Sequence, residues 1–374
     1  MTIKPVHYHE GGFPSKRIEW ERLIPLIGPA SAALARYDGT LAAVPNAALL
    51  LSPLMTQEAV LSSRIEGTQA TMSEVLEYEA GINLKTDPEK TADIHEVLNY
   101  RKAMWRAVEL LKKLPLCQRL LNETHKVLME GVRRHNKSPG EYRKIQNWIG
   151  PPGCPIEKAS YIPISGEKLP QAMSRWEQFI HEEFQDKLVQ LSLLHGEFEA
   201  LHPFLDGNGR LGRMFFPLFL FSTKLIRSPM FYISAFLEAH RDEYYEKLRD
   251  ISRKNEWTDW CCFFLEAIRE QALENHEKTT AVLQLYESEK NRIIELIHSH
   301  HAIKALDFIF TRPIFSSSAF INESGIPTRP TAHRFLKILR DNDMFHVLNP
   351  AEGRKPAVFV FRSLLNIVEG REAF

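Results

Sequence analysis

One glycine-containing stretch, residues 202–213, constrains this chain more than any other part of it. It reads His-Pro-Phe-Leu-Asp-Gly-Asn-Gly-Arg-Leu-Gly-Arg. Glycines on both sides of Asn208 allow the backbone to turn sharply and to direct several N–H groups at one point, and a helix is expected to begin near Arg210. Arg210 and Arg213 lie three residues apart on the first turn of that helix, so both can reach an anion held by the loop. The stretch therefore predicts a binding site for phosphate groups.

Two other side chains of this stretch supply groups that phosphoryl chemistry needs. The carboxylate of Asp206 is a hard oxygen ligand, suited to a magnesium ion that bridges phosphates. His202 is able to accept a proton near neutral pH. A base, a metal ligand and an anion cradle thus lie within twelve residues, and the expected anion is a polyphosphate.

The stretch matches every fixed position of the Fic family signature, His-x-Phe-x-(Asp or Glu)-Gly-Asn-Gly-Arg-x-x-Arg, so the chain resembles a Fic protein over roughly residues 10–270. Taken one at a time, these residues would also fit an ordinary glycine loop between two helices, with a histidine that caps one of the helices. The resemblance implies a mainly α-helical Fic core with a β-hairpin flap, and it makes His202 the catalytic residue. It also implies that the nucleotide is bound by Asp206, Gly207, Asn208, Gly209, Arg210, Leu211, Gly212 and Arg213.

A second motif lies upstream, where Ser62-Ser-Arg-Ile-Glu66-Gly67 ends a predicted helix. Gly67 is expected to terminate that helix as a left-handed cap. Ser62 and Glu66 are four residues apart and share one helix face, so the serine could steady the glutamate. This spacing is also that of an ordinary solvated helix face. Beside the signature, however, it resembles the inhibitory motif of Fic proteins, (Ser or Thr)-x-x-x-Glu-(Gly or Asn), which implies that Glu66 reaches the nucleotide site and pairs with Arg213. A carboxylate can pair with a guanidinium through two hydrogen bonds, so we expect a bidentate pair.

The helical period disappears over residues 138–164. Residues 140–150 alternate like a strand, Pro-Pro-Gly at 151–153 begins a loop, and residues 159–164 can return as a second strand. A surface hairpin without a task is one interpretation. By its place before the signature, the segment resembles the Fic flap, which covers the nucleotide and pairs its exposed edge with an extended segment of the target protein. On that resemblance the nucleotide is lined by Ile149, Gly150, Pro151 and Pro152.

Helical periodicity accounts for most of the remaining chain up to about residue 286. Residues 18–80 are expected to form helical pieces broken by prolines at 25, 29, 45 and 53. Further helices are expected at residues 91–113, 116–131, 169–184, 187–201 and 234–247, with a buried apolar helix after Arg213. His125 reads as a packed histidine without a role. Tyr244 aligns with a family position near the nucleotide.

The last ninety residues have a different pattern. Helices at residues 291–298, 316–323 and 330–340, followed by short β runs at 345–348 and 358–361, have the order of a winged helix. Its third helix carries basic residues that would suit DNA, namely Arg329, Arg334, Lys337 and Arg340. Winged helices also serve as dimer or protein docking modules, so DNA and a homodimer are both left open. We therefore expect an N-terminal helical regulatory region at 1–105, a Fic catalytic core at 106–284 and a winged-helix domain at 285–374.

Composition limits the cellular setting. A chain of 374 residues is too long for one hydrophobic core, and its 47 basic and 47 acidic side chains give no overall attraction to nucleic acid or anionic membrane. The first residues have no apolar segment, and the most apolar run, residues 214–221, is too short for a bilayer. Four cysteines show neither metal-site nor disulfide spacing. These features predict a cytoplasmic protein without a membrane partner.

The resemblance implies a protein adenylyltransferase that uses ATP and Mg²⁺. His202 would deprotonate a Ser, Thr or Tyr hydroxyl of a target protein, Asp206 would hold the metal, and Arg213 would hold the γ-phosphate. Three alternatives remain. The chain could be a nucleotide-sensing, DNA-binding transcription regulator, or a toxin-like module that acts with a partner. It could also be a Fic enzyme that transfers phosphate, phosphocholine or UMP, or that removes AMP.

Overall fold

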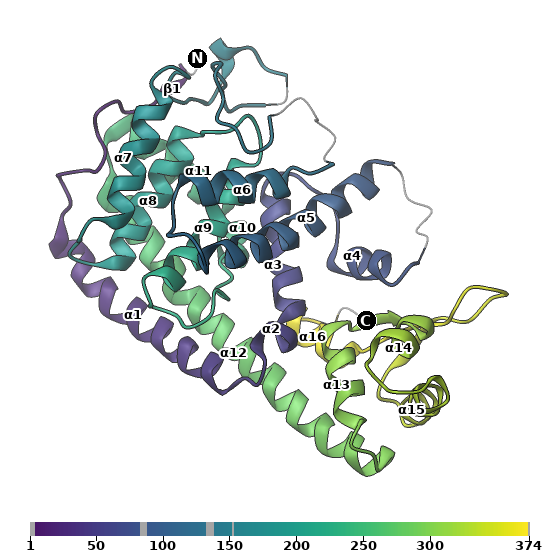
Figure 1. Ribbon diagram of the computed structural model, residues 1–374. Helices are drawn as coiled ribbons and strands as arrows, with labels where there is room; N and C mark the ends of the chain where they lie inside the picture. The colour runs from purple at the N-terminus through teal and green to yellow at the C-terminus, as the bar shows by residue number, and fades with distance from the viewer. Residues whose placement is uncertain (1–3, 83–87, 132–137, 152, 373–374) are drawn as a thin grey trace. The chain divides into compact units, whose positions relative to one another are not determined.

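The computed structural model describes residues 4–82, 88–131, 138–151 and 153–372, and most of them are helical (Figure 1). The chain forms two compact units. The first contains Met1–Asp38, Leu61–Gly67 and Leu98–Leu273, and the second contains Gly39–Val60, Thr68–Val97 and Glu274–Phe374. The boundaries expected after residues 105 and 284 fall inside two continuous helices, α5 (Pro88–Leu111) and α12 (Trp257–Ile297). Neither boundary expected from the sequence coincides with the end of a helix.

The first unit is built around two helices that are adjacent in the chain and in space, α8 (Lys187–Leu201) and α9 (Asn208–Ser222) (Figure 1). Every residue of α9 from Asn208 to Leu220 is buried, as expected for a central helix. Around this pair pack α7 (Leu169–His181), α6 (Gln118–Leu128) and α11 (Arg241–Lys254). Asp186 caps α8 by accepting hydrogen bonds from the N–H groups of Leu188 and Val189, both at 2.9 Å. The capped helix ends where the signature begins.

The remaining helices follow the predicted periodicity with some changes in their bounds. They are α1 (Trp20–Ala43), α2 (Ala47–Leu50), α3 (Ser52–Ile65), α4 (Met72–Glu79) and α10 (Ser234–Ala239). The single helix expected over residues 234–247 is divided between α10 and α11 at His240.

Two of the prolines expected to break the first helix do not do so. Pro25 and Pro29 both lie inside α1. They are four residues apart and exposed, so they share the outer face of the helix. The carbonyl groups that lack an N–H partner on that face can bond to water, which lowers the cost of the missing hydrogen bonds.

The flap segment, residues 138–164, contains less strand than expected. Its two arms are joined by a single bridge between Ile149 and Tyr161. The short strand β2 (Tyr161–Ile162) pairs in parallel with β1 (Val6–His7) near the start of the chain. Within residues 140–150, side chains bond two of the backbone carbonyl oxygens: Nη1 of Arg143 donates to that of Ile145 at 3.2 Å, and Nε2 of Gln146 donates to that of Asn147 at 2.9 Å.

The C-terminal part of the second unit contains a three-stranded antiparallel sheet. Its order is β3 (Ile314–Ser316), β5 (Val358–Val360) and β4 (His346–Asn349). The accompanying helices are α13 (Ala302–Thr311), α14 (Ser317–Glu323), α15 (Arg329–Asp341) and α16 (Arg362–Glu369). The two β runs predicted at the end of the chain correspond to β4 and β5, whereas the strand β3 between α13 and α14 was not expected from the sequence.

The first helix of this module was predicted in the wrong place. Residues 291–297 are the end of α12, and the first helix of the module is α13, at residues 302–311. The helix α12 continues past residue 286 because its apolar face continues, with Val282, Tyr286, Ile293 and Ile297 all buried.

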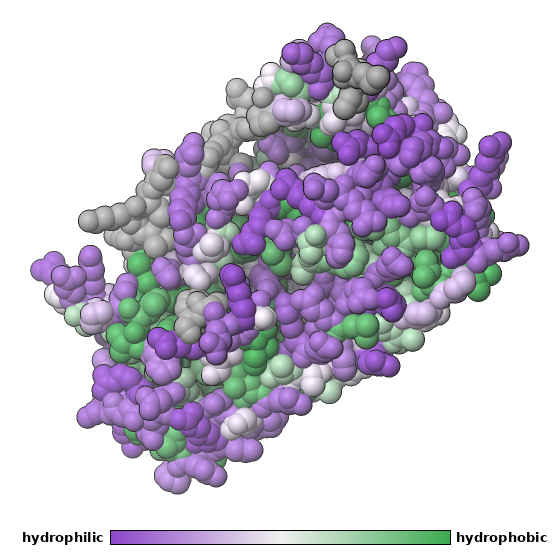
Figure 2. Space-filling view, turned by 180° about the vertical axis from the view of Figure 1, so that it is seen from behind, coloured by the Kyte–Doolittle hydropathy of each residue, from purple (hydrophilic) through white to green (hydrophobic). Residues whose placement is uncertain are grey.

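Hydrophilic residues cover most of the face seen in Figure 2, with smaller hydrophobic patches between them. Within the described part of the chain, no helix combines the length and the apolar character needed to cross a membrane.

Candidate functional site

His202 stands at the C-terminal end of α8, where the helix stops and the signature loop starts. Its backbone is left-handed, with φ 47° and ψ 61°. Arg143, from the base of the flap segment, fixes this turn: its Nε donates to the carbonyl oxygen of His202 at 2.9 Å, and its backbone N–H donates to that of Pro203 at 2.9 Å. Nη2 of Arg143 also donates to the carbonyl of Leu201 at 3.1 Å. A buried guanidinium thus holds the histidine backbone in place.

The surroundings of His202 favour its neutral form. Burial lowers the pKa of the imidazole from 6.5 to about 4, and the positive charge of Arg143 acts in the same direction, while Glu66 opposes both. At neutral pH the ring therefore carries no charge and can accept a proton. Nδ1 is buried, which leaves Nε2 as the nitrogen for exchange with the neighbouring cavity.

The loop between His202 and α9 is closed by its own asparagine. Oδ1 of Asn208 accepts from the N–H of Phe204 at 2.8 Å, and Nδ2 donates to the carbonyl oxygen of Phe204 at 2.8 Å. Gly207 has φ 76°, a conformation that glycine adopts without strain. The N–H of Gly207 donates to Oδ1 of Asp206 at 2.7 Å. Asn208 therefore acts by shaping the loop, and α9 begins directly after the turn.

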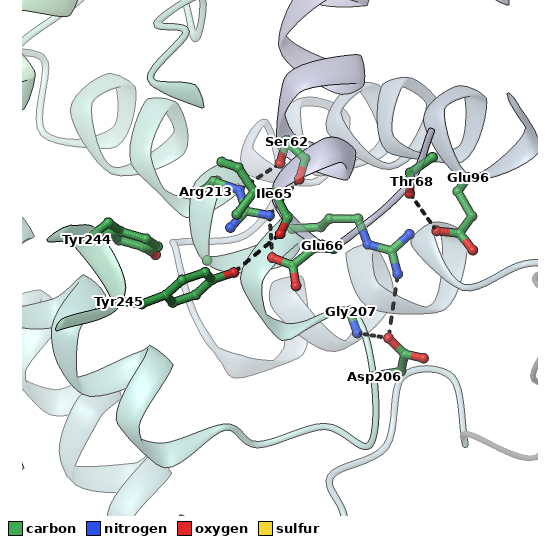
Figure 3. Close-up of polar contacts among 12 residues, drawn as sticks. Ser62, Ile65, Glu66, Thr68, Glu96, Asp206, Gly207, Arg213, Tyr244 and Tyr245 are labelled. Carbon is green, nitrogen blue, oxygen red and sulfur yellow. Dashed lines mark hydrogen bonds and ion pairs between the residues drawn. The ribbon is translucent and has the colours of Figure 1, made fainter. Parts of the chain in front are cut away.

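Glu66 and Arg213 are brought together at the start of α9 (Figure 3). Nη2 of Arg213 donates to Oε1 of Glu66 at 2.6 Å and to the carbonyl oxygen of Ser62 at 2.8 Å, while Nε donates to Oγ of Ser62 at 2.8 Å. The expectation that Ser62 steadies the glutamate is wrong, since its hydroxyl and carbonyl hold the arginine. The pair is also not bidentate, because Ser62 takes the second position on the guanidinium.

The carboxylate of Glu66 lies over the first turn of α9. A methyl group placed on Gly209 would collide with Oε1 of Glu66 and lie 3.0 Å from Nη1 of Arg213. Burial alone would raise the pKa of Glu66, but the guanidinium of Arg213 outweighs it and the pKa is held below its usual value. The glutamate is therefore ionised, and it occupies the place that the loop and the helix terminus offer to an anion. Gly67 directly follows with φ 104°, as predicted for the end of the helix.

A cavity of about 600 Å³ opens beside this pair, within the size range of ligand pockets. The predicted residues that line it are Glu66, Ile149, Gly150, Pro151, His202, Gly209, Arg213 and Tyr244. The others, which lie outside the lining, are Ser62, Gly67, Asp206, Gly207, Asn208, Arg210, Leu211 and Gly212. Pro152 falls outside the described residues.

Several residues of the cavity were not found from the sequence. Tyr245 lines it beside Tyr244, and its hydroxyl donates to the carbonyl oxygen of Ile65 at 3.4 Å. The hydroxyl of Tyr244 forms a hydrogen bond of 3.0 Å with Nε2 of buried His195. Glu199 also lines it, and burial raises the pKa of this carboxyl to about 8 against the opposing charge of Arg213. Glu199 lies three residues before His202 on α8, a spacing that could have placed it on the same face.

Asp206 is suited to a magnesium ion that arrives with a nucleotide. Among the described residues, no three His, Cys, Asp or Glu side chains gather to hold a metal. Mg²⁺ keeps several waters, however, and commonly binds one or two carboxylates together with substrate phosphates. The Asp206 side chain is 27% exposed, and its Oδ1 lies 3.6 Å from Nη2 of Arg210. One accessible carboxylate next to an anion site fits this chemistry.

Fold and site together define a helical protein in which a glycine loop, a neutral histidine and an arginine paired with a glutamate lie beside one cavity. The chain belongs to the Fic/DOC family: residues 24–109 match the model of the Fic/DOC family N-terminal region, and residues 115–220 match the Fic/DOC family model. This agrees with the resemblance carried by residues 202–213.

Curated relatives carry the name protein adenylyltransferase Fic. The protein from Drosophila willistoni is 26% identical over 171 residues, which are 44% of this chain and 30% of that protein. The protein from Drosophila grimshawi is 27% identical over 171 residues, or 44% and 31% of the two chains. The chain thus spans less than a third of the length of these relatives.

Solved structures show the same fold. A Fic family protein from Desulfovibrio desulfuricans G20 has a TM-score of 0.56 at 20% sequence identity. The alignment covers 91% of this chain and 95% of the Desulfovibrio chain. A Fic domain containing signaling protein from Bacteroides thetaiotaomicron VPI-5482 has a TM-score of 0.53 at 17% identity, covering 67% and 98%.

Proposed function

We propose that this protein is a protein adenylyltransferase, which transfers AMP from ATP to a Ser, Thr or Tyr hydroxyl of a target protein and is inhibited by its own Glu66. The observation that carries the proposal is the Glu66 carboxylate, which lies against Gly209 and pairs with Arg213 at the start of α9. The phosphates of a nucleotide would compete for that position, because a helix N-terminus and a guanidinium both attract them.

The proposed reaction uses the neutral His202 as a base. Nε2 takes the proton of the target hydroxyl while that oxygen attacks the α-phosphorus of ATP. The bond from the α-phosphorus to the bridging oxygen breaks, and pyrophosphate leaves with the electron pair. Mg²⁺, bound through Asp206 and the phosphates, would supply positive charge near the transferred group. Arg213, once released by Glu66, would hold the γ-phosphate, and the N–H groups at the start of α9 would stabilise charge on the phosphoryl oxygens.

The target is proposed to dock on the flap segment. One edge of β2 is taken by β1 and the other by Ile149, which leaves the outer side of residues 145–149 for an added strand. Three large apolar side chains are exposed there: Ile145 at 65%, Trp148 at 42% and Ile149 at 37%. An extended, partly apolar segment of another protein fits this edge.

The test is protein labelling with ATP that carries its label on the α-phosphate. A lysate incubated with Glu66→Gly should show labelled proteins, and mass spectrometry should find AMP on a hydroxyl residue. Glu369→Gly is a matched control, because Glu369 also ends a helix before a left-handed glycine but is not among the residues that line the cavity. Labelling with another group, or AMP removal, would replace adenylylation by one of the other Fic reactions. A Glu66→Gly variant that neither adds nor removes a group would favour a nucleotide sensor or a module that needs a partner.

A second activity, DNA binding, is favoured by one observation in the C-terminal module. The basic residues of α15, Arg329, Arg334, Lys337 and Arg340, are all exposed. We propose that they contact phosphates of a DNA duplex. In anisotropy titrations, Arg334→Ala with Lys337→Ala should weaken binding and reduce the salt slope by about two. Exposed Lys112 and Lys113, changed to alanine together, are the control. If the unaltered protein shows no salt-dependent binding, the module is assigned to protein docking or dimer formation.

A further inference from the structure

His125, which the sequence presents as a packed core histidine, has both ring nitrogens bonded to the backbone of other segments. It lies on α6 and is fully buried. The N–H of Gly140, at the base of the flap segment, donates to Nδ1 at 2.9 Å. Nε2 lies 2.9 Å from the carbonyl oxygen of Asp206. Because an N–H can only donate, Nδ1 carries no proton, so Nε2 carries it and donates to Asp206.

The ring also supports the signature loop by contact. Its plane stacks on Phe204 with a centroid distance of 3.8 Å and an angle of 14°. A methyl group placed on Gly207 would lie 3.4 Å from Nε2 of His125 and 2.9 Å from Sδ of Met129. Residues 204, 206 and 207 of the loop thus all contact the imidazole of His125. A shift of their backbone would break the hydrogen bond to Asp206 or the stack on Phe204.

We propose that His125 is a positioning residue, which sets the place of Asp206 relative to the base of the flap segment. This inference rests on the proposed transfer reaction. The carboxylate and the carbonyl of Asp206 share one Cα, so holding the carbonyl limits where the metal-binding oxygens can lie. The N–H of Gly207, which donates to Oδ1 of Asp206 at 2.7 Å, completes the restraint.

Arg143 holds the other end of the loop in a similar way, because its Nε donates to the carbonyl oxygen of His202 at 2.9 Å. Gly140 and Arg143 belong to the same short stretch of the flap segment. That stretch is therefore linked through His125 to the metal-binding residue and through Arg143 to the base. An apolar residue in place of His125 would leave the N–H of Gly140 and the carbonyl oxygen of Asp206 without these hydrogen bonds.

Three substitutions separate these contacts. His125→Phe keeps the ring over Phe204 and removes both hydrogen bonds. His125→Asn places an amide near the position of Nδ1 and can keep the bond from Gly140. His125→Gln reaches the position of Nε2 and can keep the bond to Asp206. Leu128→Ala is the matched control, because Leu128 is buried on the same helix and its loss weakens packing without touching either bond.

Two measurements are needed. Amide hydrogen exchange at Gly140 should become fast in His125→Phe and His125→Gln but stay slow in His125→Asn and Leu128→Ala. The kcat for AMP transfer, measured in the Glu66→Gly background at saturating ATP and Mg²⁺, should fall about ten- to a hundredfold in His125→Phe, since small misplacements of reacting groups cost that much. His125→Gln should recover most of kcat, and His125→Asn should not.

The proposal is overturned if His125→Phe keeps slow exchange at Gly140 and full kcat. It is also overturned if His125→Phe loses no more kcat than Leu128→Ala at an equal loss of melting temperature, since the residue would then serve packing alone. If the parent protein transfers no AMP, the proposed function fails first. In that case the affinity for ATP with Mg²⁺, measured by calorimetry, replaces kcat. We expect weaker Mg²⁺-dependent binding in His125→Phe and recovery of that binding in His125→Gln. Unchanged binding in both variants would overturn the proposal.

Discussion

Oε1 of Glu66 lies 2.6 Å from Nη2 of Arg213, and the same nitrogen donates to the carbonyl oxygen of Ser62 at 2.8 Å. The guanidinium is fully buried, whereas the glutamate side chain keeps 33% of its exposure and faces the cavity. The end of α3 therefore holds the arginine firmly, while the carboxylate can be displaced from the cavity side. This asymmetry suits a contact that competes with a ligand.

Glu66→Gly should increase the rate of protein labelling. If the paired arrangement is favoured by about 3 kcal/mol, the competent population is below about one per cent, and the rate should rise about a hundredfold. Initial rates with α-labelled ATP check this. An unchanged rate would make residues 62–67 an ordinary helix end. As a further check, Glu66→Gly with Arg213→Ala should be no faster than Arg213→Ala alone, because no guanidinium remains to be released.

Ser62→Ala should also raise the rate, but less than Glu66→Gly does. The substitution removes the acceptor for Nε of Arg213 and leaves the bond to the carbonyl of residue 62. One hydrogen bond contributes about 1 kcal/mol, which corresponds to about a fivefold change. Parallel rate measurements on Ser62→Ala and its neighbour Ser63→Ala test this. An equal effect of the two would contradict a specific role for Ser62.

His202→Ala should lower transfer by about two to four decades, the usual cost of losing a general base. Nucleotide binding should stay near normal, because the base acts on the incoming hydroxyl. Calorimetry gives the binding and labelling gives the rate. His181→Ala, at the exposed end of α7, is the control. A His202→Ala variant that keeps a third of the activity would remove this residue from its role.

The pH dependence of transfer should reflect the lowered pKa of His202, which burial brings to about 4. Since the neutral imidazole is the active form, kcat/KM should fall as the pH decreases through that value, and it should be independent of this group at neutral pH. Arg143→Met removes a charge that lowers this pKa, so the midpoint should rise while staying below 6.5, because burial remains. Arg143→Lys keeps the charge, so it should slow the reaction without moving the midpoint. Equal midpoints in all three proteins would contradict the electrostatic role of Arg143.

Asp206→Ala should lower activity at every magnesium concentration and weaken the dependence on the metal, because the ion is the largest positive charge near the transferred group. Titration of Mg²⁺ against rate gives both quantities. The chelated parent protein sets the baseline. Full activity of the variant in excess chelator would remove Asp206 as the metal ligand.

The sequence by itself determined the elements that depend on local chemistry. The helix predicted at 187–201 has those bounds in α8, and α9 starts at Asn208, two residues before the expected Arg210. The positive φ of Gly67 and Gly207 also follows from residue type, since glycine tolerates that region at low cost. The signature was readable for the same reason: its residues are close in the chain, so their mutual distances are set by a turn and one helical period.

The tertiary structure decided whatever depends on contacts between distant residues. It gave His125 two backbone partners, at Gly140 and Asp206, and it placed Arg143 against His202. It limited the pairing of residues 140–150 to the bridge of Ile149 with Tyr161, and side chains bond the carbonyl oxygens of Ile145 and Asn147. It also turned Ser62 toward Arg213 and away from Glu66. None of these could be read from periodicity, which records the face of a helix or strand but not the partner that another segment brings to it.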